Sequence, residues 1–302
     1  MNTDLAFNEL LHKNITAERG VSLANHSTFK IGGVCDLAVF PESREELALT
    51  LKILRSLDVK HRVIGRGSNI LFSDAGYGGA LVFTGKMCSV SAREDGTVYA
   101  ESGATLKSIA LAAAKSGLSG LEFAHGIPGS LGGGIYMNAG AYGGEISDVL
   151  KYSEYYDTES EKFGRFDHRE HDFSYRHSVY AERPELIIVG ACFSLESGDA
   201  CAIKAQIDEY AQKRKNSQPL EYPSAGSAFK RPLGDFAARL IDVSGLKGLT
   251  VGGAQVSEKH AGFIVNRGGA TASDVMELMA RVRDEVCSRH GVLLESEIEY
   301  VE

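Results

Sequence analysis

The chain has 302 residues, enough for two domains or for one domain with a large elaboration. Hydrophobic residues make up 43% and charged residues 24%, which is ordinary for a globular protein and excludes an intrinsically disordered chain. The formal charge of −8 disfavours nucleic acid or an anionic membrane as the main partner, although a locally basic pocket could still bind an anionic small molecule.

The cysteines and the N-terminus narrow the class of protein further. The 5 cysteines are scattered singly without C-x-x-C spacing, so the sequence predicts neither a disulfide framework nor a metal site. The start, MNTDLAFNELLHKN, lacks the basic and apolar regions of a signal peptide, and no apolar run approaches a membrane span. We therefore expect a soluble cytoplasmic protein without metal, and with neither a membrane nor a nucleic acid as partner.

Apolar periodicity predicts a mixture of helices and strands along the whole chain. Ser43 and Glu46 have the spacing of a capping box, which predicts that a helix begins there. A shift in composition at 196–199 indicates a domain boundary. In chain order we expect a helix within residues 1–25, a strand at 36–40, a helix at 43–57, a strand at 61–64, paired strands at 80–83 and 98–101, a helix at 106–116, strands at 150–157 and 187–195, helices at 200–215 and 235–243, strands near 255 and 264, a helix at 273–289 and a last strand at 293–301.

A first glycine loop, Gly65-Arg66-Gly67-Ser68-Asn69, follows the strand at 61–64. It fails the dinucleotide-binding G-x-G-x-x-G pattern, because position 70 is Ile70 and no capped helix follows. The successive glycines are instead compatible with a nest, in which backbone N–H groups and the side chains of Ser68 and Asn69 face one anion. Taken alone, the pattern favours a plain turn at least as much.

A second and denser glycine cluster, HGIPGSLGGGIYMNAGAYGG, runs over residues 125–144. It is apolar as well as glycine-rich, unlike a solvated linker. This composition predicts backbone packed closely against something flat and large, such as a pyrophosphate joined to an aromatic ring system. The alternative is a sheet crossing lined by glycines.

The two glycine loops, in this order and about sixty residues apart, resemble the FAD-binding module of the enolpyruvyl-UDP-sugar reductases. The segments NHSTFKIGG (25–33) and PGSLGG (128–133) look like that family's signatures, and the likeness extends from Asn25 to Glu302. The resemblance implies an α+β fold: an FAD-binding module of the PCMH/vanillyl-alcohol-oxidase type over residues 1–196, in two α/β subdomains split near residue 84, and a C-terminal α+β substrate domain over 197–302.

The resemblance also implies non-covalent FAD, with its diphosphate on the first glycine loop and its flavin against residues 126–141. Related oxidases often tether FAD to a histidine in such a loop, whereas this loop offers Asn69. The implied cofactor-binding residues are Ile31, Gly32, Gly33, Gly65, Arg66, Gly67, Ser68, Asn69, Gly126, Ile127, Pro128, Gly129, Ser130, Gly132, Gly133, Asn138, Ala139, Gly140 and Ala141.

Three further segments match the family's catalytic motifs. Reduction of an enol ether conjugated to a carboxylate needs a hydride, a stabiliser of negative charge and a proton donor. The resemblance implies Arg176 as the stabiliser of the enolate carboxylate, Ser227 as the proton donor to C2 and Glu297 as the partner at the developing charge. Taken without the resemblance, these residues are more simply a surface ion-pair arginine, a turn serine and a solvated glutamate.

The C-terminal motif departs from the family in one respect. Family members usually have proline before the catalytic glutamate and a basic residue two positions after it, whereas this chain has Ser296 and Glu299. Glu295 and Glu299 therefore stay as alternatives to Glu297.

Several basic and polar residues are candidates for binding a UDP-sugar. Lysines and arginines at a helix C-terminus also compensate the helix dipole, so Lys213 and Arg214 have a structural alternative. The candidate substrate-binding residues are Tyr175, Lys213, Arg214, Lys230 and Gln255.

No inserted tyrosine-bearing loop is found, so the resemblance implies a member of the shorter subfamily. We expect the protein to be a monomer. The resemblance implies a ping-pong reductase in which NADPH is the co-substrate and a UDP-sugar enolpyruvate the substrate. One alternative is another flavin oxidoreductase, which oxidises a sugar or alcohol with oxygen. The other is a non-catalytic nucleotide-sugar- or flavin-binding protein.

Overall fold

The structure, a computed structural model, describes residues 2–302. By its internal contacts the chain forms two compact units. Unit 1 contains the described residues up to Arg19, Leu37–Arg66 and Gly79–Arg214, and unit 2 contains Gly20–Asp36, Gly67–Gly78 and Lys215–Glu302. Most of helix α6 (Ala200–Ser217) thus belongs to unit 1, although the sequence predicts a domain boundary before it. The functional division at residue 197 stays a prediction.

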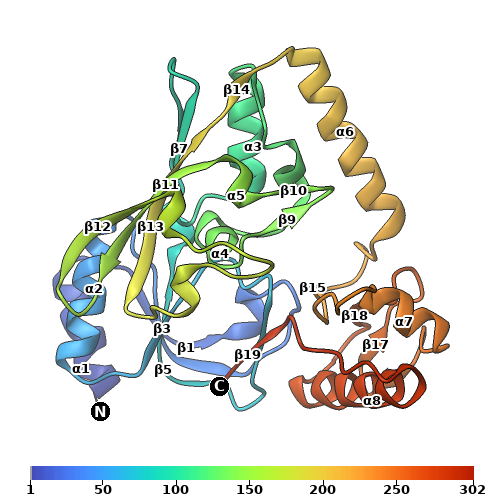
Figure 1. Cartoon of the computed structure of the whole chain (residues 1–302). Helices are drawn as coiled ribbons and strands as arrows, with labels where there is room; N and C mark the ends of the chain where they lie inside the picture. Colours follow the sequence, from blue (N-terminus) through green and yellow to red (C-terminus); the bar gives the residue numbers. More distant parts are fainter. Residues whose placement is uncertain (1) are drawn as a thin grey trace. The chain divides into compact units, whose positions relative to one another are not determined.

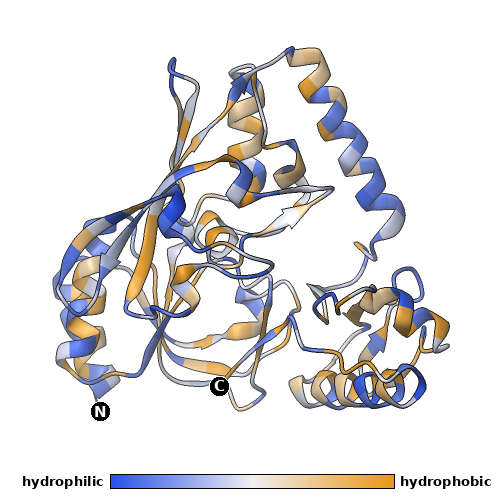
Figure 2. Cartoon of the chain, viewed as in Figure 1, coloured by the Kyte–Doolittle hydropathy of each residue, from blue (hydrophilic) through white to orange (hydrophobic). Residues whose placement is uncertain are grey.

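Unit 1 contains a five-stranded antiparallel sheet in the order β12-β11-β13-β7-β6, of which Figure 1 labels β12, β11, β13 and β7. The middle strand β13 is apolar and buried over most of its length (Figure 2), so the sheet has a core on both sides. Helix α3 (Leu106–Lys115) packs on it, and the Thr105 hydroxyl caps that helix by accepting from Ser108 N at 2.9 Å. The strands are β6 (Val90–Ala92), β7 (Thr97–Glu101), β11 (Leu150–Asp157), β12 (Lys162–Asp167) and β13 (Leu186–Ser194).

A second sheet has the order β1-β2-β5-β3, and within unit 1 helices α1 and α2 pack with it around an apolar cluster. Strand β3 pairs in parallel with β5. The predicted capping box of α2 is half formed: Ser43 Oγ accepts from Glu46 N at 3.1 Å, but the Glu46 carboxylate accepts from Glu42 N instead of Ser43 N. The elements are α1 (Asn2–His12), β1 (Ala17–Ser22), β2 (Val34–Val39), α2 (Arg44–Ser56), β3 (His61–Ile64) and β5 (Tyr77–Phe83).

Short elements complete unit 1. They are η2 (Thr84–Lys86), β8 (Leu118–Ser119), η3 (Glu122–Gly126), α4 (Leu131–Tyr136), β9 (Gly140–Ala141), β10 (Gly144–Glu145), α5 (Ile146–Val149), η4 (His168–Glu170), η5 (Val179–Ala181) and β14 (Glu196–Ser197).

Unit 2 is built on a four-stranded antiparallel sheet, β15-β18-β17-β16, packed against helix α8 (Figure 1). Phe29, Ile31 and Leu71 lie in the same apolar core as residues of α8, so segments from the N-terminal part of the chain complete this unit. Its elements are η1 (Leu23–His26), β4 (Ile70–Phe72), β15 (Ser224–Ser227), α7 (Ala237–Val243), β16 (Thr250–Val251), β17 (Ala254–Val256), β18 (Phe263–Asn266), α8 (Ala272–His290) and β19 (Glu299–Val301).

Two sequence-based predictions of strands are wrong. The strands at 80–83 and 98–101 both exist but do not pair with each other, because β5 pairs with β3 and β7 with β13. The predicted last strand over 293–301 is formed only at β19, which pairs in parallel with β4. Residues 295–297 bond instead to residues 228–230, through Lys230 N to Glu295 O and Glu297 N to Ala228 O, both at 2.9 Å. Among the helices of residues 2–302, none has the length and apolar composition that crossing a membrane requires.

Candidate active site

Within unit 1 the first and second glycine loops touch. Gly65 follows strand β3, and a Cβ atom at this position would overlap Ser130 Oγ and lie 3.3 Å from Ser130 Cβ. Ser130 is buried and immediately precedes helix α4. The absence of a side chain at Gly65 therefore lets two segments far apart in sequence approach closely.

The second glycine loop presents unpaired polar groups. Leu131 N and Gly132 N donate to Ala104 O and Ser102 O, each at 2.8 Å, and so fix the loop to the segment after β7. In contrast, the amides of Gly129, Ser130 and Gly133 have no acceptor among residues 2–302. The Ser102 hydroxyl is also buried without a partner in the described chain. A phosphate-bearing cofactor fits this donor set, because it would accept from amides that the protein leaves unpaired.

The predicted cofactor residues 138–141 serve the fold as well. Asn138 is buried, and its side chain donates to Ser174 O at 3.3 Å and accepts from Ser147 N at 2.9 Å. Gly140 and Ala141 form strand β9, which pairs with β10. Ala139 N donates to Gly134 O at 2.8 Å. The Asn138 side chain thus joins the glycine loop to the segment that carries Arg176.

Arg176 lies at the tip of a tight turn in unit 1. Ser174 and His177 exchange backbone hydrogen bonds of 3.3 and 3.2 Å across this turn, and Arg176 itself is left-handed, with φ 58°. Such a conformation costs a residue other than glycine about 1–2 kcal/mol. The Arg176 guanidinium lies over the half-exposed Tyr175 ring, with Cζ 5.0 Å from its centre, and Ser178 Oγ donates to Tyr136 O at 2.8 Å. The turn is thereby held beside helix α4.

One of the two basic residues at the end of α6, Arg214, contacts the glycine loop. The Arg214 guanidinium donates to Gly126 O, and the rings of Tyr142 and Tyr210 stack with centres 4.5 Å apart. Lys213 pairs with Glu209 at 2.6 Å on the exposed surface of α6. Arg214 therefore supports the predicted flavin loop, and a role in binding a UDP diphosphate stays a prediction for both basic residues. Ile127 packs on the apolar cluster of unit 1, whereas Pro128 is exposed.

Within unit 2, Ser227 lies on a β-bulge. Strand β15 pairs with β18 through Ser224 and Ser227, with a register shift between them, and Gly226 in the bulge has φ 80°. A bulge turns the side chain that follows it out of the regular alternation. The half-buried Ser227 hydroxyl makes no hydrogen bond to any other described residue, so it can donate to a bound molecule.

Glu297 is placed next to Ser227 by backbone contacts. Its N–H donates to Ala228 O at 2.9 Å, and its carbonyl accepts from Asn69 Nδ2 at 2.7 Å. Glu299 N donates to Asn69 O at 3.0 Å. Asn69, predicted as a cofactor residue, thus holds the Glu297 segment.

The alternatives to Glu297 are used elsewhere in unit 2. Glu295 is exposed and pairs with Lys230, Nζ to Oε2, at 3.6 Å. Glu299 opens strand β19. The side chain of Gln255 donates to Gly248 O at 3.3 Å and to Thr250 Oγ1 at 3.2 Å, within the β16–β17 hairpin. Lys230 and Gln255 therefore each have a partner within the unit, and substrate binding by either stays a prediction.

The signature at residues 25–33 is mostly structural. Ile31 is buried in the core of unit 2, and a Cβ atom at Gly32 or Gly33 would clash with Phe72 or with the backbone at 74–76. Gly33 N donates to Ser73 O at 2.9 Å. Any contact of Ile31, Gly32 and Gly33 with a cofactor would be made by their backbone atoms, and this contact stays a prediction.

Thr28 is a residue that the sequence reasoning missed. Its N–H donates to Gly67 O at 3.2 Å and its hydroxyl to Ser224 O at 2.7 Å. It therefore ties the first glycine loop to the strand of Ser227. Nothing local to Thr28 signals this role, since Ser224 lies 196 residues away. In the same loop, the side chains of Arg66 and Ser68 have no partner among the described residues.

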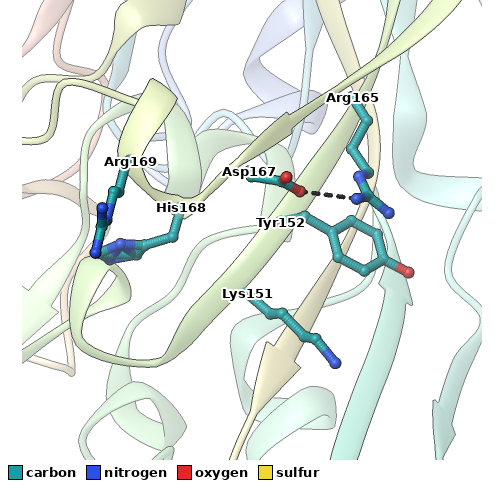
Figure 3. Close-up of a pocket in the computed structure, with 6 residues that line it drawn as sticks. All are labelled: Lys151, Tyr152, Arg165, Asp167, His168 and Arg169. Carbon is teal, nitrogen blue, oxygen red and sulfur yellow. Dashed lines mark ion pairs between the residues drawn. The ribbon is translucent and has the colours of Figure 1, made fainter.

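A cavity of about 560 Å³ in unit 1 is lined by other residues (Figure 3). Arg165 pairs with Asp167 at 2.9 Å and lies over the Tyr152 ring at 4.6 Å, and His168 Nε2 lies 2.8 Å from Ser147 O. Arg165, Asp167 and His168 thus have partners within unit 1, and none of the predicted site residues is among the lining residues. The cavity is lined by Lys151, Tyr152, Arg165, Asp167, His168 and Arg169.

Comparisons with known proteins give one consistent result. Residues 218–301 match the profile of the UDP-N-acetylenolpyruvoylglucosamine reductase C-terminal domain, and residues 35–161 match that of an FAD binding domain. A UDP-N-acetylenolpyruvoylglucosamine reductase of Clostridium perfringens (strain SM101) is 42% identical over 100% of this chain and 99% of its own length. The corresponding protein of Syntrophomonas wolfei is 47% identical over 92% of this chain and 93% of its own.

A solved structure supports the same relationship. The UDP-N-acetylenolpyruvylglucosamine reductase of Thermus caldophilus matches with a TM-score of 0.81 and 36% identity, covering 95% of this chain and 100% of its own. Together with the FAD-binding profile, this match confirms the predicted fold class, an FAD-binding module followed by a C-terminal α+β domain.

Proposed function

Because the chain belongs to the UDP-N-acetylenolpyruvoylglucosamine reductase family, we propose that it uses FAD and NADPH to reduce UDP-N-acetylglucosamine enolpyruvate to UDP-N-acetylmuramate, a step of peptidoglycan precursor synthesis. The observation that carries the proposal is the Ser227 hydroxyl. It is half-buried, has no partner among the described residues and is placed by a bulge beside the Glu297 segment.

The cofactor has a set of groups that fits it. The unpaired amides of Gly129, Ser130 and Gly133, with the buried Ser102 hydroxyl, are the donors that would hold FAD in unit 1. Arg66 and Ser68 would add donors for its diphosphate. Bound FAD, once reduced by NADPH, would supply the hydride, and the remaining chemistry belongs to the protein's own residues.

Three side chains divide the work on the substrate in this proposal. The guanidinium of Arg176 pairs with the substrate carboxylate and stabilises the charge that develops there. The Ser227 hydroxyl donates its proton to C2, and Glu297 acts at the same developing charge. Tyr175, Lys213, Arg214, Lys230 and Gln255 are the proposed contacts for the rest of the UDP-sugar.

The proposal extends to the domain organisation, the oligomeric state and the location of the protein. We propose an FAD-binding domain over residues 1–196 and a substrate domain over 197–302, in a monomeric protein of the cytoplasm. The match to a solved family member over 95% of this chain supports the shared architecture.

A stepwise anaerobic titration tests the proposed function. The purified protein should be yellow, lose its visible flavin absorption when NADPH is added, and recover it when the enolpyruvyl UDP-sugar follows. Two other results would contradict the proposal. Recovery only with oxygen would favour an oxidase on the same fold, and a protein that binds FAD but never consumes NADPH would favour a binding protein.

A further inference from the structure

A buried polar network lies under the turn that carries Arg176. His171 is fully buried, and its Nε2 lies 2.7 Å from the hydroxyl of Ser153, which lies 2.6 Å from the hydroxyl of Tyr180. The other ring nitrogen, Nδ1, lies 3.0 Å from Asp167 O and 3.2 Å from His168 O. All these groups belong to unit 1.

The partners fix the protonation of the histidine. Carbonyl oxygens only accept, so Nδ1 carries the proton and donates it to Asp167 O and His168 O. A neutral ring then leaves Nε2 as an acceptor, so Ser153 must donate to it and Tyr180 must donate to Ser153. If the ring became charged, Ser153 would have to turn its proton towards Tyr180. The Tyr180 proton would then lose its acceptor in this network, so every proton of the network has a partner when His171 is neutral and carries its proton on Nδ1.

His171 closes the base of the Arg176 turn. Its carbonyl accepts from Val179 N at 2.7 Å, so residues 171 and 179 form the neck of the loop. Its ring stacks on Phe173, with centres 4.9 Å apart and planes within 5°. The loop between them holds two residues in the left-handed conformation, Asp172 at φ 47° and Arg176 at φ 58°. Strained residues such as these keep their geometry only when the surrounding contacts fix them.

We propose that His171 is a positioning residue for the reduction, which holds the Arg176 turn in place through the Ser153 hydrogen bond and the Phe173 stack. This inference rests on the proposed function, because it assigns His171 an effect only through Arg176. Few titratable groups face the His171 ring. They are His168 and Glu170 on η4, Asp167, which is paired with Arg165, and the hydroxyls of Tyr155 and Tyr180.

The test replaces the histidine and follows the two half-reactions separately. His171→Phe keeps a ring for the stack but removes both nitrogens. We expect it to retain FAD, to be reduced by NADPH within about threefold of the wild-type rate, and to be reoxidised by the enolpyruvyl UDP-sugar about 10- to 100-fold more slowly, as a small misplacement of Arg176 predicts. Tyr180→Phe is the matched control. It removes one buried hydroxyl of the network but leaves the bond between Ser153 and His171, and should keep the wild-type reoxidation rate.

A double-mutant cycle separates positioning from a general structural role. In an Arg176→Ala background, His171→Phe should change the reoxidation rate by less than about threefold, because the group it positions is gone. An equal slowing in both backgrounds, or a wild-type rate in the single variant, would overturn the proposal. If wild-type reduced enzyme is not reoxidised by this substrate, the proposed function itself fails.

Two measurements that do not depend on turnover complete the test. In the wild-type protein, nitrogen-15 NMR of the histidine ring should show a neutral Nδ1–H tautomer, and the opposite tautomer would refute the network at once. Amide hydrogen exchange at residues 172–178 should be faster in His171→Phe than in the wild type, whereas residues of β13 should be unaffected.

Discussion

Gly65→Ala tests the contact between the two glycine loops. The added Cβ overlaps Ser130 Oγ and lies 3.3 Å from Ser130 Cβ, so the hydroxyl must rotate away and the loop must shift by a few tenths of an ångström. Overpacking of this kind costs about 1–3 kcal/mol. For a chain of 302 residues each kcal/mol lowers the Tm by roughly 1–2 °C. If about 1.4 kcal/mol of the cost falls on the FAD-bound state, the Kd of FAD rises about tenfold.

Two matched variants make this prediction specific. Gly85→Ala adds a methyl group where no atom lies within 4 Å, so the Kd and Tm should match the wild type. Ser130→Ala removes the overlapping hydroxyl, so adding Gly65→Ala in that background should change the Kd by less than about threefold. Flavin fluorescence titration gives the Kd and differential scanning calorimetry the Tm. Wild-type values for Gly65→Ala, or a full loss in the Ser130→Ala background, would refute the reasoning.

Three further predictions concern the supports of the site. Arg214→Met removes the donor to Gly126 O and should raise the Kd of FAD about 10-fold or more by fluorescence titration. Lys213→Met breaks the exposed pair with Glu209 and the contact over the Tyr210 ring but leaves the bond to Gly126, so the Kd should stay near the wild-type value; equal effects would count against the loop contact. The Asp74 carboxylate accepts hydrogen bonds from Ala272 N and Ser273 N at the start of α8, and Asp74→Asn removes its negative charge. Urea denaturation should show a free energy of unfolding lower by about 1 kcal/mol, and an unchanged midpoint would contradict this prediction. Burial lowers the pKa of His171 below 6.5, so the contribution of this histidine to stability should be present above about pH 6.5 and be lost as the pH falls further. The Tm should therefore fall less steeply with decreasing pH in His171→Gln than in the wild type. Identical falls of Tm with pH in the two proteins would exclude His171 as the cause.

Local signals in the sequence predict much of the fold. The Ser43 cap and the periodicity after it give helix α2. The prediction fails where distant segments compete. Residues 293–298 have the alternation of a strand, but the 228–230 segment takes their hydrogen bonds, so the strand begins only at Glu299.

The candidate site, like the fold, is predicted from the sequence only in part. The glycine pattern predicts a close approach of backbone, and the contact of Gly65 with Ser130 agrees with it. The supports of Arg176 and Ser227 carry no sequence signal, because Thr28 and His171 act on partners that only the tertiary fold brings near, namely Ser224 and Ser153. Ordinary polar residues gain such roles from burial and from long-range hydrogen bonds.

The most direct test of the assignment uses Ser227→Ala in stopped-flow experiments without oxygen. Removing one unpaired hydroxyl should leave FAD bound and its reduction by NADPH near the wild-type rate. Reoxidation by the enolpyruvyl UDP-sugar should slow by about 10²-fold or more, the usual contribution of a positioned proton donor. Reoxidation at the wild-type rate would show that another group protonates the substrate and would contradict the central claim.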